Sequence, residues 1–172
     1  TFPDVPEGLT MRLGLADPDK RIKDLDRAGV SKQVLLATVG SLFYNVPPVD
    51  LEASCALSRM HNLHLSEFVK KYPDRFIGAA VIPLQDGHAA ADELDYAYHQ
   101  LGLKAVEICT HVDGKNIDSP DLSPFYEKVS ELNVPVMVHT DLTRHIKCAA
   151  ADLLDKYFLA NLFIHPFEIM IS

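Results

Sequence analysis

Four short apolar runs recur along the chain and predict the strands of a buried sheet. They lie at residues 33–38, 76–82, 105–110 and 134–139. Each run is continuous rather than alternating between apolar and polar positions, which is typical of parallel strands covered on both faces. We therefore expect four parallel strands, each buried on both faces.

Helical periodicity fills the intervals between these runs. Asp17-Pro18 is a helix-start signature and predicts a short helix over residues 18–28. A long helix is predicted over residues 49–72, where Pro73 stops the pattern. A third helix ends at Gly102, and a fourth begins at Ser119-Pro120. The apolar positions of the long helix are Ala53, Ala56, Leu57, Met60, Leu63 and Phe68.

The strands and helices alternate strictly, and no hairpin signal joins two of the strands. Parallel strands connected by right-handed helical crossovers give an α/β barrel or a doubly wound sheet. We expect the four strands to be adjacent, parallel and in chain order. The length of 172 residues fits a single domain over residues 1–172.

Composition excludes several partners and compartments. The 16 Lys plus Arg residues against 24 Asp plus Glu give a net charge of -8 without a basic cluster, which disfavours nucleic acid. The longest apolar tract, residues 157–171, is interrupted by polar residues, so no membrane span is expected. The 3 cysteines lack any paired spacing, which favours a reducing, cytoplasmic location over a disulfide framework.

Candidate chemistry lies where the strands end, because ligands of parallel α/β sheets bind at that edge. His139 ends the fourth run. A histidine there is either a metal ligand or acid/base group, or a structural residue hydrogen-bonded to a neighbouring carbonyl. His111 follows the third run, and Phe43 and Tyr44 lie in the loop after the first. Glu107 lies inside an apolar strand and needs a partner, so it is either a salt-bridged structural residue or part of the site.

Other candidate sites have weaker support. His61 and His64 are three residues apart on the long helix, a spacing that can chelate a metal. His64 is also four residues from both Met60 and Phe68, which favours a packing role. No Ser or Cys has a neighbouring base in the sequence, and no glycine-rich nucleotide motif occurs.

Several stretches together resemble the amidohydrolase-2 family. This is the branch of metal-dependent TIM-barrel amidohydrolases that includes aminocarboxymuconate-semialdehyde decarboxylase and the resorcylate decarboxylases. The stretches are Arg21-Ile-Lys-Asp-Leu-Asp-Arg-Ala-Gly-Val30, Asn62 with Tyr72-Pro-Asp-Arg-Phe76, Val81-Ile-Pro-Leu-Gln85, Leu101-Gly-Leu-Lys-Ala-Val-Glu-Ile-Cys-Thr-His-Val112, and Pro124-Phe-Tyr-Glu127 through Val134-Pro-Val-Met-Val-His139. The resemblance implies a (β/α)8 barrel, present here as a partial barrel of about strands two to five.

The resemblance also implies a divalent metal, with zinc as the expected ion. In that family, a His-x-His pair on the first strand, a histidine ending the fifth and an aspartate ending the eighth hold the metal. Only the fifth-strand ligand has a counterpart here, His139, because the chain contains no His-x-His motif. His111, Phe43 and Tyr44 would line the substrate pocket, and no catalytic residue is assigned.

Two functions remain open at this point. The first is a metal-dependent hydrolase or non-oxidative decarboxylase acting on a small organic acid or amide. The second is a truncated, catalytically inactive half-barrel with an assembly or interaction role. The absence of an initiator Met and the apolar C-terminus suggest that both ends are cut from something longer. Uncovered strand edges would make the chain a homo-oligomer.

Overall fold

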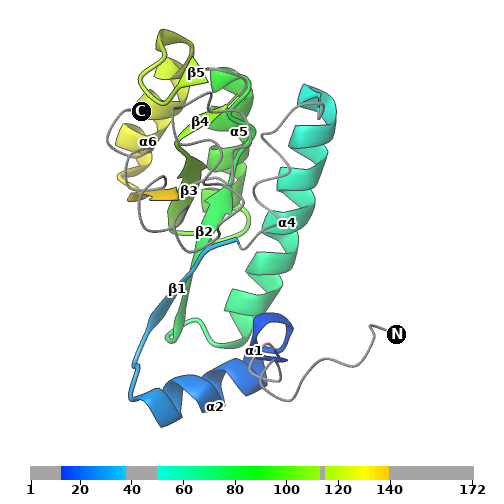
Figure 1. Cartoon of the computed structure of the whole chain (residues 1–172), viewed down its shortest axis with the longest axis vertical. Helices are drawn as coiled ribbons and strands as arrows, with labels where there is room; N and C mark the ends of the chain where they lie inside the picture. Colours follow the sequence, from blue (N-terminus) through cyan, green and yellow to red (C-terminus); the bar gives the residue numbers. More distant parts are fainter. Residues whose placement is uncertain (1–12, 38–49, 113–114, 140–172) are drawn as a thin grey trace, which may run out of the picture.

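Four parallel strands form the sheet in the computed structural model, which describes residues 13–37, 50–112 and 115–139 (Figure 1). The strands are β1 (Gln33–Leu35), β2 (Phe76–Val81), β3 (Ala105–Cys109) and β6 (Val136–His139). Each hydrogen-bonds its neighbour in the order β1-β2-β3-β6, and every pairing is parallel. The predicted adjacency, direction and chain order are therefore confirmed, and the sheet is an open half-barrel.

The helices are α1 (Leu13–Ala16), α2 (Pro18–Ala28), α4 (Leu51–Lys71), α5 (Gly87–His99) and α6 (Ser123–Leu132), with a short 3₁₀ turn η2 (Pro120–Leu122). Helices α2, α4 and α5 begin at an aspartate that caps the first turn. Asp17, Asp50 and Asp86 each accept a hydrogen bond from a backbone N–H of the first turn of α2, α4 and α5. Helix α2 ends at Gly29, whose φ of 70° is left-handed, so the predicted helix 18–28 is confirmed. None of the described helices is both long and apolar enough to cross a bilayer.

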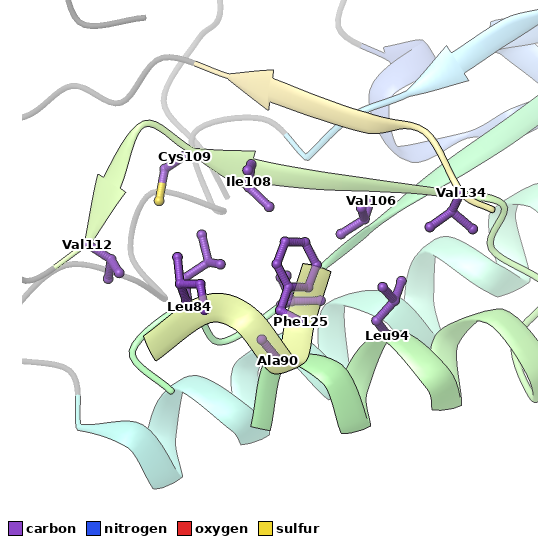
Figure 2. Close-up of a cluster of buried hydrophobic side chains, with 11 residues drawn as sticks. Leu84, Ala90, Leu94, Val106, Ile108, Cys109, Val112, Phe125 and Val134 are labelled. Carbon is purple, nitrogen blue, oxygen red and sulfur yellow. The ribbon is translucent and has the colours of Figure 1, made fainter. Parts of the chain in front are cut away.

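The main apolar core lies between β3 and the helices α5 and α6 (Figure 2). Val106 and Ile108 of β3 pack in one cluster with Leu94 of α5 and Phe125 of α6. Phe125 is fully buried, and burying a side chain of that size stabilises the fold by roughly 1.5–3 kcal/mol. Because side chains alternate along a strand, Glu107 faces the opposite side of the sheet, which we call the inner face.

Helix α4 packs against β2 through small and polar side chains. A Cβ on Gly78 of β2 would lie 3.1 Å from Val69 Cγ2 and 3.2 Å from Leu65 Cδ2 of α4, so the missing side chain lets the helix pack close to the strand. The helix buries Ser54, Ser58, Asn62, Leu65, Ser66 and Phe68. The predicted apolar face was therefore partly wrong, because Met60 and Leu63 are exposed. The polar side chains are buried because they hydrogen-bond to the sheet and to neighbouring loops, as described below.

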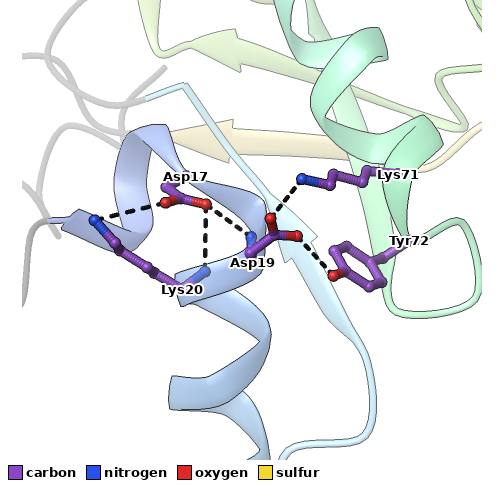
Figure 3. A network of polar contacts seen from close by, with 5 residues as sticks. All are labelled: Asp17, Asp19, Lys20, Lys71 and Tyr72. Carbon is purple, nitrogen blue, oxygen red and sulfur yellow. Dashed lines mark hydrogen bonds and ion pairs between the residues drawn. The ribbon is translucent and has the colours of Figure 1, made fainter.

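Polar contacts attach α2 to the C-terminal end of α4 (Figure 3). Asp19 accepts hydrogen bonds from Lys71 Nζ at 2.6 Å and from Tyr72 Oη at 2.7 Å. Arg75 pairs with Asp26 at 2.7 Å and donates to the carbonyl of Ser31 at 2.6 Å. These contacts place α2 at the amino-terminal end of the sheet, away from the strand ends that carry the candidate chemistry.

The two outer strands of the described sheet are more exposed than the sequence predicts. Burial of the strand residues is nearly complete in β2 and β3, as expected. In β1 and β6, however, Val34 is 40% exposed and Val138 is 37% exposed. Each of these strands pairs on one side only among the described strands, so the expectation of burial on both faces was wrong for them. An apolar run alone does not distinguish a central strand from an edge strand.

A short antiparallel ladder follows β3. Strand β4 (His111–Val112) pairs with β5 (Lys115–Asn116), where the sequence predicts only a polar loop. Val112 is 2% exposed and joins the core cluster of α5 and α6. Two residues are too few to show strand alternation, so the pattern of polar and apolar residues could not predict this ladder.

Candidate active site

His139 occupies the carboxyl end of the last described strand. It is the final residue of β6 and pairs in register with Cys109, the final residue of β3. His139 is exposed. Alternation along β6 places it on the same face as Met137, which pairs with Glu107. The sheet therefore carries His139 at its carboxyl edge, on the inner face, with one side of the residue open to solvent.

Glu107 lies one layer below His139 on the inner face. The residue is 4% exposed, in the middle of β3. Its Oε2 accepts a hydrogen bond from the backbone N–H of Ala37, just after β1, at 2.7 Å. Its Oε1 is buried and has no hydrogen-bond partner in the part of the chain that the structure describes. One carboxyl oxygen thus holds the end of β1, while the other is directed at the interior without a donor.

Burial dominates the electrostatics of this carboxyl group. Desolvation raises the pKa of Glu107 above its ordinary value, because the charged form loses its hydration. The hydrogen bond from Ala37 and the charge of His139 both act to lower that pKa. No ion pair of Glu107 with Lys or Arg occurs among the described residues.

The other predicted pocket residues cannot be placed beside His139. His111 begins β4 and pairs with Asn116, but the position of its side chain lies outside the described structure. Phe43 and Tyr44 lie outside the described residues altogether. Their proposed contact with a substrate is therefore untested.

The described residues do not form a complete metal site. No cluster of three or more His, Cys, Asp or Glu side chains occurs among them in a position to hold an ion. A catalytic zinc ion commonly needs three protein ligands and an open position. His139 fits the role of one such ligand, since it is exposed at a strand end, and the orphaned Glu107 oxygen below it marks a polar interior. The remaining ligands would have to come from outside the described residues.

A cavity of about 300 Å³ opens on the other side of the sheet, near β1 and α4. Its described lining includes Arg21, Leu36, Ala37, His61 and His64, and it includes no residue of β3 or β6. His64 is exposed rather than packed, which corrects the packing role predicted for it. Burial and the nearby charge of His64 lower the pKa of His61.

Sequence reasoning missed a buried polar network that positions the end of β2. Asn62 Nδ2 donates to the carbonyl of Val81 and to Glu93 Oε1, each at 2.8 Å, while Val81 N–H donates to Asn62 Oδ1 at 2.8 Å. Arg59 pairs with Glu93 at 2.8 Å and stacks over Tyr96. In the sequence, the only sign of this network is that Asn62 lies four residues from both Ser58 and Ser66. The network holds α4, α5 and the strand end together.

Comparison with known proteins connects this geometry with an enzyme family. The sequence profile of the family described as Amidohydrolase (Amidohydro_2) matches residues 6–163. The chain is 37% identical over 153 residues to a 2-amino-3-carboxymuconate-6-semialdehyde decarboxylase of Dictyostelium discoideum, covering 88% of this chain and 40% of that protein. It is 33% identical to a gamma-resorcylate decarboxylase of Rhizobium sp., covering 70% of this chain and 38% of that protein.

Solved structures agree with the sequence relatives. A 5-carboxyvanillate decarboxylase of Novosphingobium aromaticivorans, with bound manganese and 3-methoxy-4-hydroxy-5-nitrobenzoic acid, matches with a TM-score of 0.79 and 25% identity. That match covers 98% of this chain and 47% of the decarboxylase chain. The chain spans about two fifths of the length of the curated relatives it matches.

Proposed function

The chain belongs to the amidohydrolase family Amidohydro_2, and from that premise we propose that the whole protein is a metal-dependent, non-oxidative decarboxylase of a small organic acid. The observation that carries the proposal is the exposed His139 at the carboxyl end of a half-barrel strand, two residues beyond Met137, which pairs with the buried Glu107. The relatives named above are decarboxylases, which favours loss of CO2 over hydrolysis of an amide. We propose that residues 1–172 form one domain of the family's barrel.

We propose His139 as one ligand of a divalent ion. Such an ion, when bound, polarises a carboxylate oxygen or activates a water molecule. The sheet orients His139 without the need to order a loop, and its exposed side leaves room for the other ligands. Imidazole suits zinc, the ion we propose, while the similar 5-carboxyvanillate decarboxylase holds manganese. Elemental analysis distinguishes the two ions.

The substrate side of the proposal rests on position in the chain. His111, Phe43 and Tyr44 follow strands at the edge where ligands of such barrels bind, and we propose that they line the substrate pocket. The substrate is proposed to be a small acid, in keeping with the acids named for the related decarboxylases. A cytoplasmic location is part of the same proposal and is supported by Cys55 and Cys109, which form no disulfide among the described residues.

The test is His139→Ala, with His88→Ala as the matched control. His88 is an exposed histidine in the first turn of α5, and it is not among the residues proposed for the site. We expect His139→Ala to lower metal occupancy and decarboxylase activity of the whole protein by a large factor, with unchanged circular dichroism because the side chain is exposed. His88→Ala should retain both. Metal content measured by elemental analysis that is equal in all three proteins would remove His139 from the ligand set.

The second candidate is an inactive half-barrel with an assembly role. Exposed Val34 and Val138 on the two outer strands favour it, because open strand edges invite pairing with another chain. The 172-residue chain by itself should contain no stoichiometric metal in either case, since one imidazole does not hold an ion tightly. Stoichiometric zinc in the whole protein would support the enzyme, and its absence the assembly role.

A further inference from the structure

The cavity near β1 and α4 combines an apolar wall with a basic side. Three of its described lining residues carry basic side chains: Arg21 of α2, and His61 and His64 of α4. The wall is formed mainly by apolar side chains, namely Val34, Leu35, Leu36, Leu65 and Phe68. The described lining includes no Asp and no Glu. A mostly apolar cavity with a few polar groups is typical of sites for small molecules, and this lining favours a negatively charged one.

Arg21 is the cation that lacks a carboxylate partner. It is half-buried, and its Nε donates to Oε1 of Gln33, at the start of β1, at 2.8 Å. That bond orients the guanidinium and leaves both of its terminal NH2 groups without a hydrogen bond to any described residue. The other arginines of the described structure, Arg27, Arg59 and Arg75, each pair with an acidic side chain. Because two parallel hydrogen bonds join a guanidinium to a carboxylate, Arg21 offers a fork for such an anion.

The acidic side chains on the same helix have other partners. Asp24 is three residues beyond Arg21, but it pairs with Arg27 at 3.8 Å. Asp19 and Asp26 are held by contacts with residues at the end of α4 and just after it (Figure 3). A carboxylate for Arg21 must therefore come from outside the described residues.

The part of the cavity formed by α4 supplies both donors and apolar contact. His61 and His64 are three residues apart and therefore lie on the same side of the helix, and an imidazole carries an N–H that can donate to an anion. His64 is exposed, which places it where the cavity meets solvent. Leu65 and Phe68 are buried on the same helix. An inorganic anion would gain nothing from these apolar side chains, whereas an organic acid would bury its apolar part against them.

We propose that this cavity binds a small carboxylic acid with a compact apolar body. Its carboxylate accepts hydrogen bonds from the terminal NH2 groups of Arg21, and its body packs against Leu65 and Phe68. The described lining includes no residue of β3 or β6. The inference therefore goes beyond the proposed decarboxylase activity, because it requires neither a metal ion nor His139.

The experiment titrates the metal-free 172-residue chain with cyclohexanecarboxylate, a carboxylate on a compact apolar ring. Backbone 1H–15N correlation spectra measure the affinity and locate the residues whose signals shift. We expect saturable shifts centred on Val34, Leu36 and the turn of α4 that contains His64. Shifts centred on other residues, or no saturable binding, would overturn the proposal.

Two matched ligands separate the contributions of charge and apolar contact. Cyclohexanecarboxamide has the same shape without the charge, and it should bind at least about tenfold more weakly, because charged hydrogen bonds to Arg21 are lost. Acetate keeps the charge without the ring, and it should also bind at least about tenfold more weakly. If either ligand bound as tightly as the acid, the proposal would be wrong. Both comparisons use the wild-type chain, so they do not depend on any variant folding.

Arg21→Gln tests the anchor of the carboxylate. The change removes the charge but keeps a polar side chain, and it should weaken binding of cyclohexanecarboxylate at least about tenfold. Arg21→Lys, which keeps the charge but not the fork, should have an intermediate affinity. The matched control is Arg27→Gln on the same helix, because the Arg27 side chain is 81% exposed and lies outside the described lining. We expect the control to bind as the wild type does. Equal affinities of Arg21→Gln and wild type would overturn the proposal, whereas failure of the whole protein to bind a metal would remove only the proposed function.

Discussion

The two buried glutamates of the described structure, Glu107 and Glu93, differ in the partners of their carboxylate groups. Glu93 accepts hydrogen bonds from Asn62 and Arg59, and the guanidinium also neutralises its charge. Glu107 accepts one hydrogen bond from a backbone N–H and pairs with no Lys or Arg among the described residues, and burial raises its pKa. The sequence could indicate that a carboxylate in an apolar strand needs a partner, but it could not name that partner, because Ala37 is 70 positions away along the chain.

His61 carries the pH-dependent prediction at this scale. Burial, and secondarily the charge of His64, lower its pKa below the ordinary value of 6.5. The unfolded chain therefore binds the proton more readily than the folded one. The stability associated with neutral His61 is fully present above about pH 6.5 and is lost as the pH falls through that value towards the lower folded pKa. Thermal unfolding should show that wild type loses more stability than His61→Gln between pH 7.5 and 5.5.

The control for this prediction is His64→Gln. It removes the repulsion between the two imidazoles but leaves the burial of His61, which is the larger cause. Its pH dependence should therefore fall between those of wild type and His61→Gln. Identical slopes for wild type and His61→Gln would show that His61 does not titrate with unfolding.

At the scale of elements, the sequence predicts the positions of the strands and helices well, but it predicts less well which faces of them are buried. The starts of α2, α4 and α5 follow from aspartate caps, and local capping chemistry is readable from the sequence. The buried face of α4 cannot be predicted in the same way. Asn62 and Ser66 are buried because they donate hydrogen bonds to the carbonyl of Val81 in β2 and to the carbonyl of Leu101 after α5. The exposure of His139 and the orphaned oxygen of Glu107 also depend on the pairing of distant strands. The sequence could name His139 only as a candidate, whereas the burial of Glu107 and its hydrogen bond from Ala37 required the fold.

Asn62→Ala tests the network that joins α4 to β2. The change leaves the N–H and carbonyl of Val81 and one oxygen of Glu93 without their partner in a buried setting. We expect a loss of about 3–5 kcal/mol in the free energy of unfolding, because buried polar groups and a buried charge lose their hydrogen bonds. Chemical denaturation followed by circular dichroism measures the loss.

Ser66→Ala is the matched control on the same helix. Ser66 is also buried, but it makes a single hydrogen bond, 2.7 Å to the carbonyl of Leu101. Its removal should cost about 1 kcal/mol. Equal losses in the two variants would mean that the Asn62 network contributes no more than one ordinary hydrogen bond.

At the scale of the whole molecule, the described sheet has two open edges, one at β1 and one at β6. β1 pairs only with β2, and β6 pairs only with β3, among the described strands. Central strands bury their apolar runs between neighbours, whereas Val34 and Val138 remain exposed. The curated relatives are more than twice as long as the matched segment, so their sheets have further chain available to cover such edges. Taken by itself, the described sheet therefore offers two edges for association.

The last prediction is that the 172-residue chain self-associates through its strand edges. Unpaired backbone N–H and C=O groups beside an exposed valine offer a template for another copy, and a lysine at such an edge disfavours pairing. In sedimentation velocity, Val34→Lys should therefore lower the sedimentation coefficient towards that of the monomer. Met60→Lys, at a position 61% exposed on α4, should leave it unchanged. An intact-mass measurement near 19.1 kDa must first establish that the sample is the 172-residue chain. A wild-type chain that stays monomeric at high concentration would contradict the prediction, and equal effects of the two lysines would locate the contact elsewhere. Loss of association in Val34→Lys alone would assign it to the β1 edge, where one more strand would continue the sheet.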